Sequence, residues 1–174
     1  MFKGQKVRLT AMRTEDLQDY REWNAQASFA RNYNSSPIRE LSEKQATDWF
    51  NEHSDQDFRF AIRPLGLDTF MGVCAIEDIQ WTHRVGWLSI ALGPEFQGHG
   101  YGIDAMQLIM YYAWNELNLH RLQLTVFDYN QPAIAMYEKL GFQKEGVFRE
   151  FLQRDGKRHD MYLYGKLASE SSDF

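Results

Sequence analysis

The stretch Leu88-Ser89-Ile90-Ala91-Leu92-Gly93-Pro94-Glu95-Phe96-Gln97-Gly98-His99-Gly100-Tyr101-Gly102 is the most informative part of this 174-residue sequence. An apolar run ends at Gly93-Pro94, three glycines then alternate, and apolar residues recur at helical spacing from Ile103 to Leu117. Glycines let a backbone approach a ligand closely. The first amides of a helix lack intrahelical acceptors and carry partial positive charge. The stretch therefore predicts a strand, a loop that suits a pyrophosphate, and a helix.

The spacing of these glycines argues against two common nucleotide-binding loops. The loop lacks the Gly-Lys-Ser/Thr ending of a P-loop, which supplies a lysine and a hydroxyl to a nucleoside triphosphate. Only Tyr101 separates Gly100 from Gly102, whereas the dinucleotide fingerprint needs two residues at that point. The structural alternative is a glycine-rich turn that merely lets the helix pack against a sheet.

Composition indicates one globular domain. Apolar residues make up 44% of the chain and charged residues 25%, as in ordinary globular proteins. We expect a single domain over residues 1–167 and a flexible tail over 168–174. No apolar run approaches the roughly 20 residues of a membrane-spanning helix, and the N-terminus lacks the apolar core of a secretory signal. The lone cysteine, Cys74, cannot form an intramolecular disulfide, so we expect a cytoplasmic protein without a membrane partner.

The charge balance bears on partners. The net charge is −5, from 19 basic and 24 acidic side chains. Nucleic-acid-binding proteins usually carry a basic stripe that neutralises phosphates, and none is found in this sequence, so no nucleic-acid partner is expected. The acidic balance slightly favours a cationic substrate such as an amine, although a modest negative charge also keeps many proteins dispersed.

Periodicity gives the order of the elements. Helices are expected at 14–24, from Ser42 through Phe50, at 103–117 and at 133–140. Strands are expected at 7–10, 58–63, 70–79, 85–92, 122–127, 147–154 and 157–167, the last two joined by the turn Asp155-Gly156. Ser28 to Glu40 has no clear period and is expected to be a loop, either one wall of a binding cleft or plain surface. The order predicts a mixed α/β (α+β) sheet rather than a doubly wound nucleotide fold.

Two helix starts carry explicit signals. Thr14-Glu15-Asp16 supplies a cap and first-turn acids for the first helix. Ser42, with Gln45 three residues later, has the pattern of a capping box for the second helix. Both signals predict where the chain enters a helix.

Set beside these elements, the sequence resembles the GCN5-related N-acetyltransferase (GNAT) family. Gln97 to Gly102 matches the family's Gln/Arg-x-x-Gly-x-Gly/Ala coenzyme A loop. Further segments match in the family's order: Asn118-Leu119-His120-Arg121-Leu122, Asp128-Tyr129-Asn130-Gln131-Pro132-Ala133, and Tyr137-Glu138-Lys139-Leu140-Gly141-Phe142 with Glu145-Gly146. This set is similar to the branch that acetylates ribosomal-protein N-termini and the polyamines spermidine and spermine. The resemblance covers nearly the whole chain.

The resemblance implies a fold and a co-substrate. The fold is a central, mostly antiparallel sheet with a splayed parallel strand pair and flanking helices. The co-substrate is acetyl-CoA, with its pantetheine arm lying along the first splayed strand and its pyrophosphate on the loop. The residues assigned to it are Ser89, Ile90, Ala91, Leu92, Gln97, Gly98, His99, Gly100, Tyr101, Gly102, Ile103 and Asn130. Asn130 has an equally weighted alternative as the cap of the helix that contains Pro132, and one side chain could do both.

The resemblance also assigns an acid, and it leaves the base open. Tyr137 matches the family's tyrosine near the coenzyme A sulfur, where its hydroxyl can protonate the departing thiolate; the alternative is a core tyrosine. Relatives often place a glutamate on the strand before the loop, whereas this sequence has Trp87 there. Glu77 and Asp78 are the nearest replacements, and we name Glu77 as the candidate base, with a solvated strand end as its alternative.

Neither the histidines nor the cysteine adds another chemistry. The five histidines show no spacing that is typical of a metal site, so no metal is expected. Cys74 lies in an apolar strand without a basic sequence neighbour that would lower its pKa, so we interpret it as a core residue rather than a nucleophile.

The sequence thus predicts an N-acetyltransferase that moves an acetyl group from acetyl-CoA to a primary amine by direct attack in a ternary complex. A peptide N-terminus, a polyamine and a small amine stay open as the acceptor, because one fold carries many acceptors. A non-catalytic acetyl-CoA-binding regulatory module and a structural partner protein are the alternatives. Relatives are frequently dimers, so a homodimer is one expectation.

Overall fold

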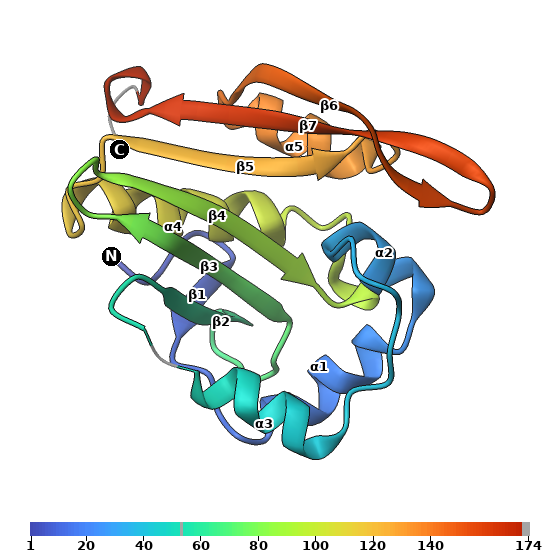
Figure 1. The fold of residues 1–174 in the computed structure, drawn as a ribbon. Helices are drawn as coiled ribbons and strands as arrows, with labels where there is room; N and C mark the ends of the chain where they lie inside the picture. Colours follow the sequence, from blue (N-terminus) through green and yellow to red (C-terminus); the bar gives the residue numbers. More distant parts are fainter. Residues whose placement is uncertain (53, 172–174) are drawn as a thin grey trace.

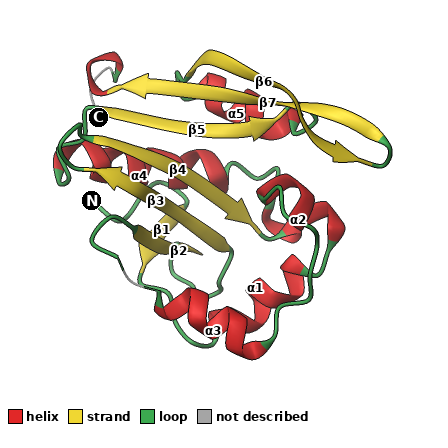
Figure 2. Ribbon diagram, in the orientation of Figure 1, coloured by secondary structure: helices red, strands yellow, loops and turns green. Residues whose placement is uncertain are grey.

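A single seven-stranded sheet organises the described part of the chain, residues 1–52 and 54–171 of a computed structural model (Figures 1 and 2). Its strands are β1 (Val7–Thr10), β2 (Phe58–Pro64), β3 (Gly72–Gln80), β4 (Val85–Leu92), β5 (Arg121–Phe127), β6 (Gln143–Arg154) and β7 (Lys157–Leu167). They lie side by side in the order β1-β2-β3-β4-β5-β7-β6. Every neighbouring pair is antiparallel except β4 and β5, which are parallel.

Helices cover both faces of this sheet. They are α1 (Asp16–Asn24), α2 (Ala27–Tyr33), α3 (Glu43–Asn51), α4 (Tyr101–Asn115) and α5 (Gln131–Lys139), with the short 3₁₀ helices η1 (Pro94–Phe96) and η2 (Ala168–Glu170). Figure 1 shows α4 behind the sheet and α1, α2 and α3 grouped beyond the ends of β3 and β4. None of the helices in the described ranges has the length and apolar character needed to cross a bilayer.

Two clusters of buried side chains hold these layers together. On one face, Met106 and Ile109 of α4 pack with Ile76 of β3 and with β5. On the other, Trp23 of α1 and Phe29 of α2 pack with β2 and β3. Because both faces are covered, β3 is buried without interruption from Gly72 to Ile76, and only its end emerges into solvent.

The parallel pair opens along its length. β4 and β5 pair from Val85 and Arg121 to Trp87 and Gln123, and they have no register beyond these residues. The remaining part of β4 therefore pairs only with β3 on its other side. The splayed parallel pair that the family resemblance implied is confirmed, and it leaves an unpaired strand edge from Leu88 onward.

Most of the predicted elements are confirmed, with two corrections near the N-terminus. Ser28 to Glu40 was expected to lack regular structure, yet α2 occupies its first part because Phe29 and Ala30 are buried against α1 and the sheet. The expected cap at residues 14–16 is absent, since α1 has no side-chain cap. Asp16 instead forms a buried ion pair with Arg63 of β2, whose Nη2 donates to both carboxylate oxygens at 2.8 and 2.7 Å.

Two further expectations concern helix starts and the C-terminus. The capping box of Ser42 and Gln45 is present at the start of α3. Residues 168–170, expected to begin a flexible tail, form η2, and the amide of Ala168 donates to the carbonyl of His120 at 2.9 Å. Residues 172–174 of the expected tail lie outside the described residues.

Candidate active site

A cavity of about 650 Å³ occupies the opening between β4 and β5. It is lined by residues of α2, β3 and β4, by the glycine loop (residues 97–102) with the start of α4, and by residues of β5 and α5. The predicted site residues among them are Glu77, Ser89, Ile90, Ala91, Leu92, Gln97, Gly98, Gly100, Gly102, Ile103, Asn130 and Tyr137. His99 and Tyr101 belong to the same loop but do not line the cavity. Residues separated by up to 60 positions in the sequence therefore meet in one place.

The glycine loop presents unpaired backbone amides at one end of this cavity. Gly98 and Gly100 have φ angles of 79° and 81°, in the left-handed region that favours glycine. Gly100 precedes α4 without a side-chain cap, and the amides from Gly98 to Ile103 meet no acceptor within the described residues. Gln97 fixes the loop because its side-chain amide donates to the carbonyl of Leu92 at 2.9 Å. This geometry suits an anionic group such as a pyrophosphate.

Two predicted residues reach the cavity from α5 and from the residue that caps it. The side-chain oxygen of Asn130 accepts from the amide of Ala133 at 3.4 Å, so its expected role as a helix cap is present. The same side chain lines the cavity and can contact a ligand there. Tyr137 is 7% exposed, and burial raises its pKa to about 12. A phenol with that pKa keeps its proton at neutral pH and is available there as a proton donor.

Glu77 stands at the end of β3, directly across from Trp87 of β4. One carboxylate oxygen lies 3.2 Å from Nε of Arg59, and the other accepts from Oγ of Ser89 at 3.0 Å. Arg59 is itself fixed because it also donates to the carbonyl of Trp49 at 3.2 Å. Glu77 is therefore an oriented side chain that faces the cavity rather than a freely solvated strand end.

Tyr33 of α2 lines the cavity beside this carboxylate. Burial, with Glu77 among the nearby groups, raises the pKa of Tyr33 far above its ordinary value. Phe29 of the same helix also lines the cavity. Asn32 and Thr125 also line it, and no local pattern in the sequence singles them out.

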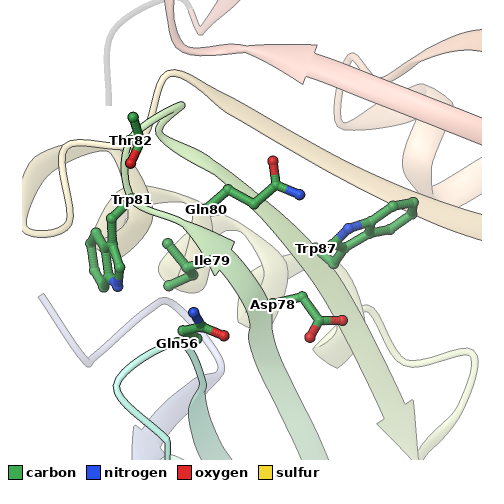
Figure 3. A pocket seen from close by; sticks show the side chains of 7 residues that line it. All are labelled: Gln56, Asp78, Ile79, Gln80, Trp81, Thr82 and Trp87. Carbon is green, nitrogen blue, oxygen red and sulfur yellow. The ribbon is translucent and has the colours of Figure 1, made fainter.

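A second, shallower hollow of about 530 Å³ adjoins the cavity at the end of β3 (Figure 3). Asp78 and Trp87 line both spaces. Asp78 lies at a β-bulge with a φ of 50°, and its amide donates to Oδ1 of Asp57 at 3.0 Å. Bulges redirect side chains, and this one leaves the carboxylate of Asp78 exposed on the boundary between the two spaces.

A sheet opened at a parallel strand pair, with an anion-binding loop at one end of the opening, defines an N-acyltransferase fold. Residues 6–143 match the family model described as the acetyltransferase (GNAT) domain. The chain therefore belongs to the GNAT family and is an acetyl-CoA-dependent N-acetyltransferase.

Similar proteins include polyamine acetyltransferases. The spermidine N(1)-acetyltransferase of Escherichia coli K12 is 31% identical over 154 residues, which cover 87% of this chain and 81% of the relative. An uncharacterized N-acetyltransferase, p20 of Bacillus licheniformis, is 27% identical over 171 residues and 95% of each chain. The structure of spermidine N-acetyltransferase from Vibrio cholerae in complex with CoA and spermine aligns with a TM-score of 0.86 at 25% identity, covering 94% and 96% of the two chains.

Proposed function

We propose that this enzyme transfers the acetyl group of acetyl-CoA to a primary amine by direct attack within a ternary complex. The observation that carries the proposal is that one cavity contains an unpaired strand edge, an amide loop, a buried tyrosine and an oriented carboxylate. Attack of an amine on a thioester needs a bound donor, a proton donor for the leaving thiolate and a proton acceptor for the amine, and these groups can supply them. The alternative of a non-catalytic module would leave Tyr137 and Glu77 without a chemical role.

The donor is held mainly by backbone groups in this proposal. The pantetheine arm lies along the open edge of β4, where Ser89 to Leu92 offer main-chain groups that β5 does not use. The pyrophosphate accepts hydrogen bonds from the amides of Gly98 to Ile103. Asn130 binds the arm from the opposite side while it caps α5. An extended ligand can pair with an unpaired strand edge in the way that another strand would.

Tyr137 is the proposed general acid. The amine nitrogen attacks the thioester carbonyl carbon, and a tetrahedral intermediate forms whose oxyanion is stabilised by main-chain amides of β4. The carbon–sulfur bond then breaks, and the departing thiolate takes a proton from the Tyr137 hydroxyl. The nitrogen loses its remaining extra proton as the amide forms, and this proton restores the phenol of Tyr137. Burial favours the neutral phenol, so the proton is present at neutral pH.

Glu77 is the proposed proton acceptor. The attacking ammonium must lose a proton, and Glu77 receives it either directly or through Ser89, whose Oγ already donates to the carboxylate. Arg59 keeps the carboxylate oriented toward the cavity. Trp87, at the position where relatives often carry a glutamate, offers no proton acceptor, so Glu77 on the neighbouring strand takes its place.

A polyamine is the first acceptor to test. The relatives named spermidine N-acetyltransferases acetylate such amines, and the acidic side chains Glu77 and Asp78 favour the approach of a cation. A peptide N-terminus and a small amine are the other candidates. A screen that follows thiol release at fixed acetyl-CoA, with spermidine, a peptide and a small amine, ranks them by kcat/KM.

The decisive test of the mechanism is Tyr137→Phe. We expect kcat to fall by about 100-fold or more, while the Kd for acetyl-CoA stays within about twofold, because only proton donation is lost. Tyr112→Phe on α4, outside the cavity, is the matched control.

With a pKa of about 12 for Tyr137, kcat should show no alkaline decline between about pH 7 and 10 from loss of this proton. Full activity of the variant would overturn the acid role, and saturable acetyl-CoA binding without turnover of any amine would overturn the enzyme proposal.

Self-association is a further prediction, first made from the family resemblance as a homodimer. A structure of the Vibrio cholerae spermidine N-acetyltransferase is described as dodecameric, which shows that a relative forms larger assemblies. We propose that this chain is at least dimeric in solution. Light scattering coupled to size-exclusion chromatography gives the mass directly, and a monomer at micromolar concentration contradicts the proposal.

A further inference from the structure

Lys6 is a cation beside the glycine loop that the sequence pattern does not indicate. Its Nζ donates to the carbonyl of His99 at 2.8 Å, across a separation of 93 residues. A lysine ammonium carries three N–H groups, so this contact uses one of them. The other two meet no acceptor within the described residues and remain available to a ligand.

The ammonium group lies against the part of the loop that lines the cavity. A Cβ built on Gly100 would be 3.0 Å from Nζ of Lys6. Gly100 itself lines the cavity, between Gly98 and Gly102. Lys6 itself does not line the cavity, but its ammonium lies beside Gly100, which does and which belongs to the stretch of unpaired amides from Gly98 to Ile103.

Asp104 fixes the segment that carries Lys6. Its carboxylate, in the first turn of α4, accepts from the backbone amides of Gln5 at 3.1 Å, Lys6 at 2.8 Å and Val7 at 2.8 Å. Asp104 is only 8% exposed, so these hydrogen bonds are well shielded from water. A Cβ on Gly4 would lie 2.5 Å from Oδ2 of Asp104, and the close approach of this turn therefore requires glycine.

The charges around the loop explain why such a cation is needed. No lysine or arginine occurs between Gln97 and Ile103, and the whole chain carries a net charge of −5. A carboxylate in the first turn of α4 would repel a bound anion. The carboxylate of Asp104, however, accepts hydrogen bonds from three backbone amides of the N-terminal segment, which offset part of its negative charge. Lys6 brings a full positive charge to a loop that otherwise offers only partial charges.

We propose that Lys6 binds the diphosphate of acetyl-CoA and that Asp104 is the residue that positions it. This inference rests on the proposed function, because it needs the cofactor to lie with its diphosphate on the glycine loop. Hydrogen bonds between charged groups are the strong ones, and Lys6 supplies two N–H groups to phosphate oxygens. The N-terminal segment thus forms part of the cofactor site.

The experiment compares three acetyl donors on wild type and Lys6→Met. Acetyl-CoA carries the diphosphate and the 3′-phosphate, acetyl-3′-dephospho-CoA carries only the diphosphate, and S-acetylpantetheine carries neither. We expect KM to rise about tenfold for both nucleotide-containing donors, with kcat unchanged, and to stay unchanged for S-acetylpantetheine. The rise should shrink as salt is added, because the site is open to solvent. Lys3→Met, on the same segment, is the matched control.

Each other outcome is informative. An equal rise in KM for all three donors would show that Lys6 only supports the fold, and a rise for acetyl-CoA alone would assign it to the 3′-phosphate; either result overturns the proposal. Asp104→Asn should reproduce the donor-dependent rise, and adding it to Lys6→Met should bring little further loss. If wild type itself turns over no amine and binds none of the donors, the proposed function fails, independently of Lys6.

Discussion

The donor side and the α2 side of the cavity are built in different ways. On the donor side, where we propose that acetyl-CoA binds, β4, the glycine loop and α4 follow one another along the chain and line the cavity. On the α2 side, Phe29, Asn32 and Tyr33 form a wall whose position depends on side-chain contacts with a distant hairpin. Under the proposed function, local backbone geometry binds the acetyl donor, and the α2 side, where the acceptor would bind, depends on side-chain contacts that single substitutions can alter.

The contacts on the α2 side join the C-terminal end of α2 to the tip of the β6–β7 hairpin and to Tyr129 after β5. Arg31 donates to both carboxylate oxygens of Asp155 at 2.8 and 3.1 Å. The hydroxyl of Tyr129 donates to the carbonyl of Arg31 at 2.5 Å, and Nη2 of Arg154 donates to the carbonyl of Asn34 at 3.1 Å. The turn at Asp155 therefore does more than reverse the chain, because it holds one wall of the cavity.

The largest expected effect is on stability, and it comes from removing the buried ion pair between Asp16 of α1 and Arg63 of β2. α1 directly precedes α2 in the chain. Asp16→Ala leaves the guanidinium of Arg63 buried without its partner, and we expect the free energy of unfolding to fall by about 3–5 kcal/mol. Urea denaturation measures it, with Glu15→Ala at the exposed neighbouring position as control. A loss below about 1 kcal/mol would show that the α2 side does not depend on this buried pair.

On the donor side, we expect a substitution of Gly102 to weaken acetyl-CoA binding the most. A Cβ there would lie 3.1 Å from Sδ of Met136 and 3.4 Å from Cδ1 of Leu92, and both neighbours line the cavity. We expect Gly102→Leu to raise the Kd for acetyl-CoA by about 100-fold or more, because the added side chain fills the space of the ligand. Calorimetry measures the Kd, and Gly146→Leu, whose Cβ would come no closer than 3.8 Å to Leu163 and which lies outside the cavity, is the control. Unchanged affinity would place the donor elsewhere.

A smaller effect is expected where the two sides meet, at Glu77. Glu77→Gln should lower kcat/KM for the amine by roughly 10- to 100-fold and leave the Kd for acetyl-CoA unchanged. The loss should be greatest at low pH, where the amine is protonated, and should diminish as the pH rises toward the pKa of the amine. A pH profile of both proteins tests this, and a loss that is independent of pH would make Glu77 a structural partner of Arg59 instead.

The smallest effect is expected at the contact between α2 and the hairpin. Arg31 and Asp155 are partly exposed, and exposed pairs contribute only about 0.2–1 kcal/mol. Arg31→Ala should therefore raise KM for the amine about two- to fivefold and leave KM for acetyl-CoA unchanged. Lys44→Ala removes a comparable exposed pair on α3 and serves as control. Equal changes in both KM values would mean that the two sides are not separate.

The sequence predicted the strand, the glycine loop and the helix of the donor side because their signals are local. The glycines, the apolar strand before them and the helix after them lie within about thirty residues, and Asn130 and Tyr137 were placed by the family pattern. Residues 14–16 were wrongly predicted to supply a side-chain cap, because nothing nearby in the sequence shows that Arg63 would pair with Asp16. Lys6 had no signal at all, because its role depends on Asp104, 98 positions away. Contacts of this kind exist only after the sheet has formed.

Cys74 on β3 has a practical consequence for following the reaction. The side chain is fully buried, and burial raises the pKa of its thiol well above the ordinary value. Disulfide reagents react with thiolates, so in the folded enzyme they detect the CoA released by turnover and not the protein itself. Because Cys74 is the only cysteine, one additional reactive thiol per chain signals that the sheet has opened. A single colour reaction can thus report both catalysis and unfolding.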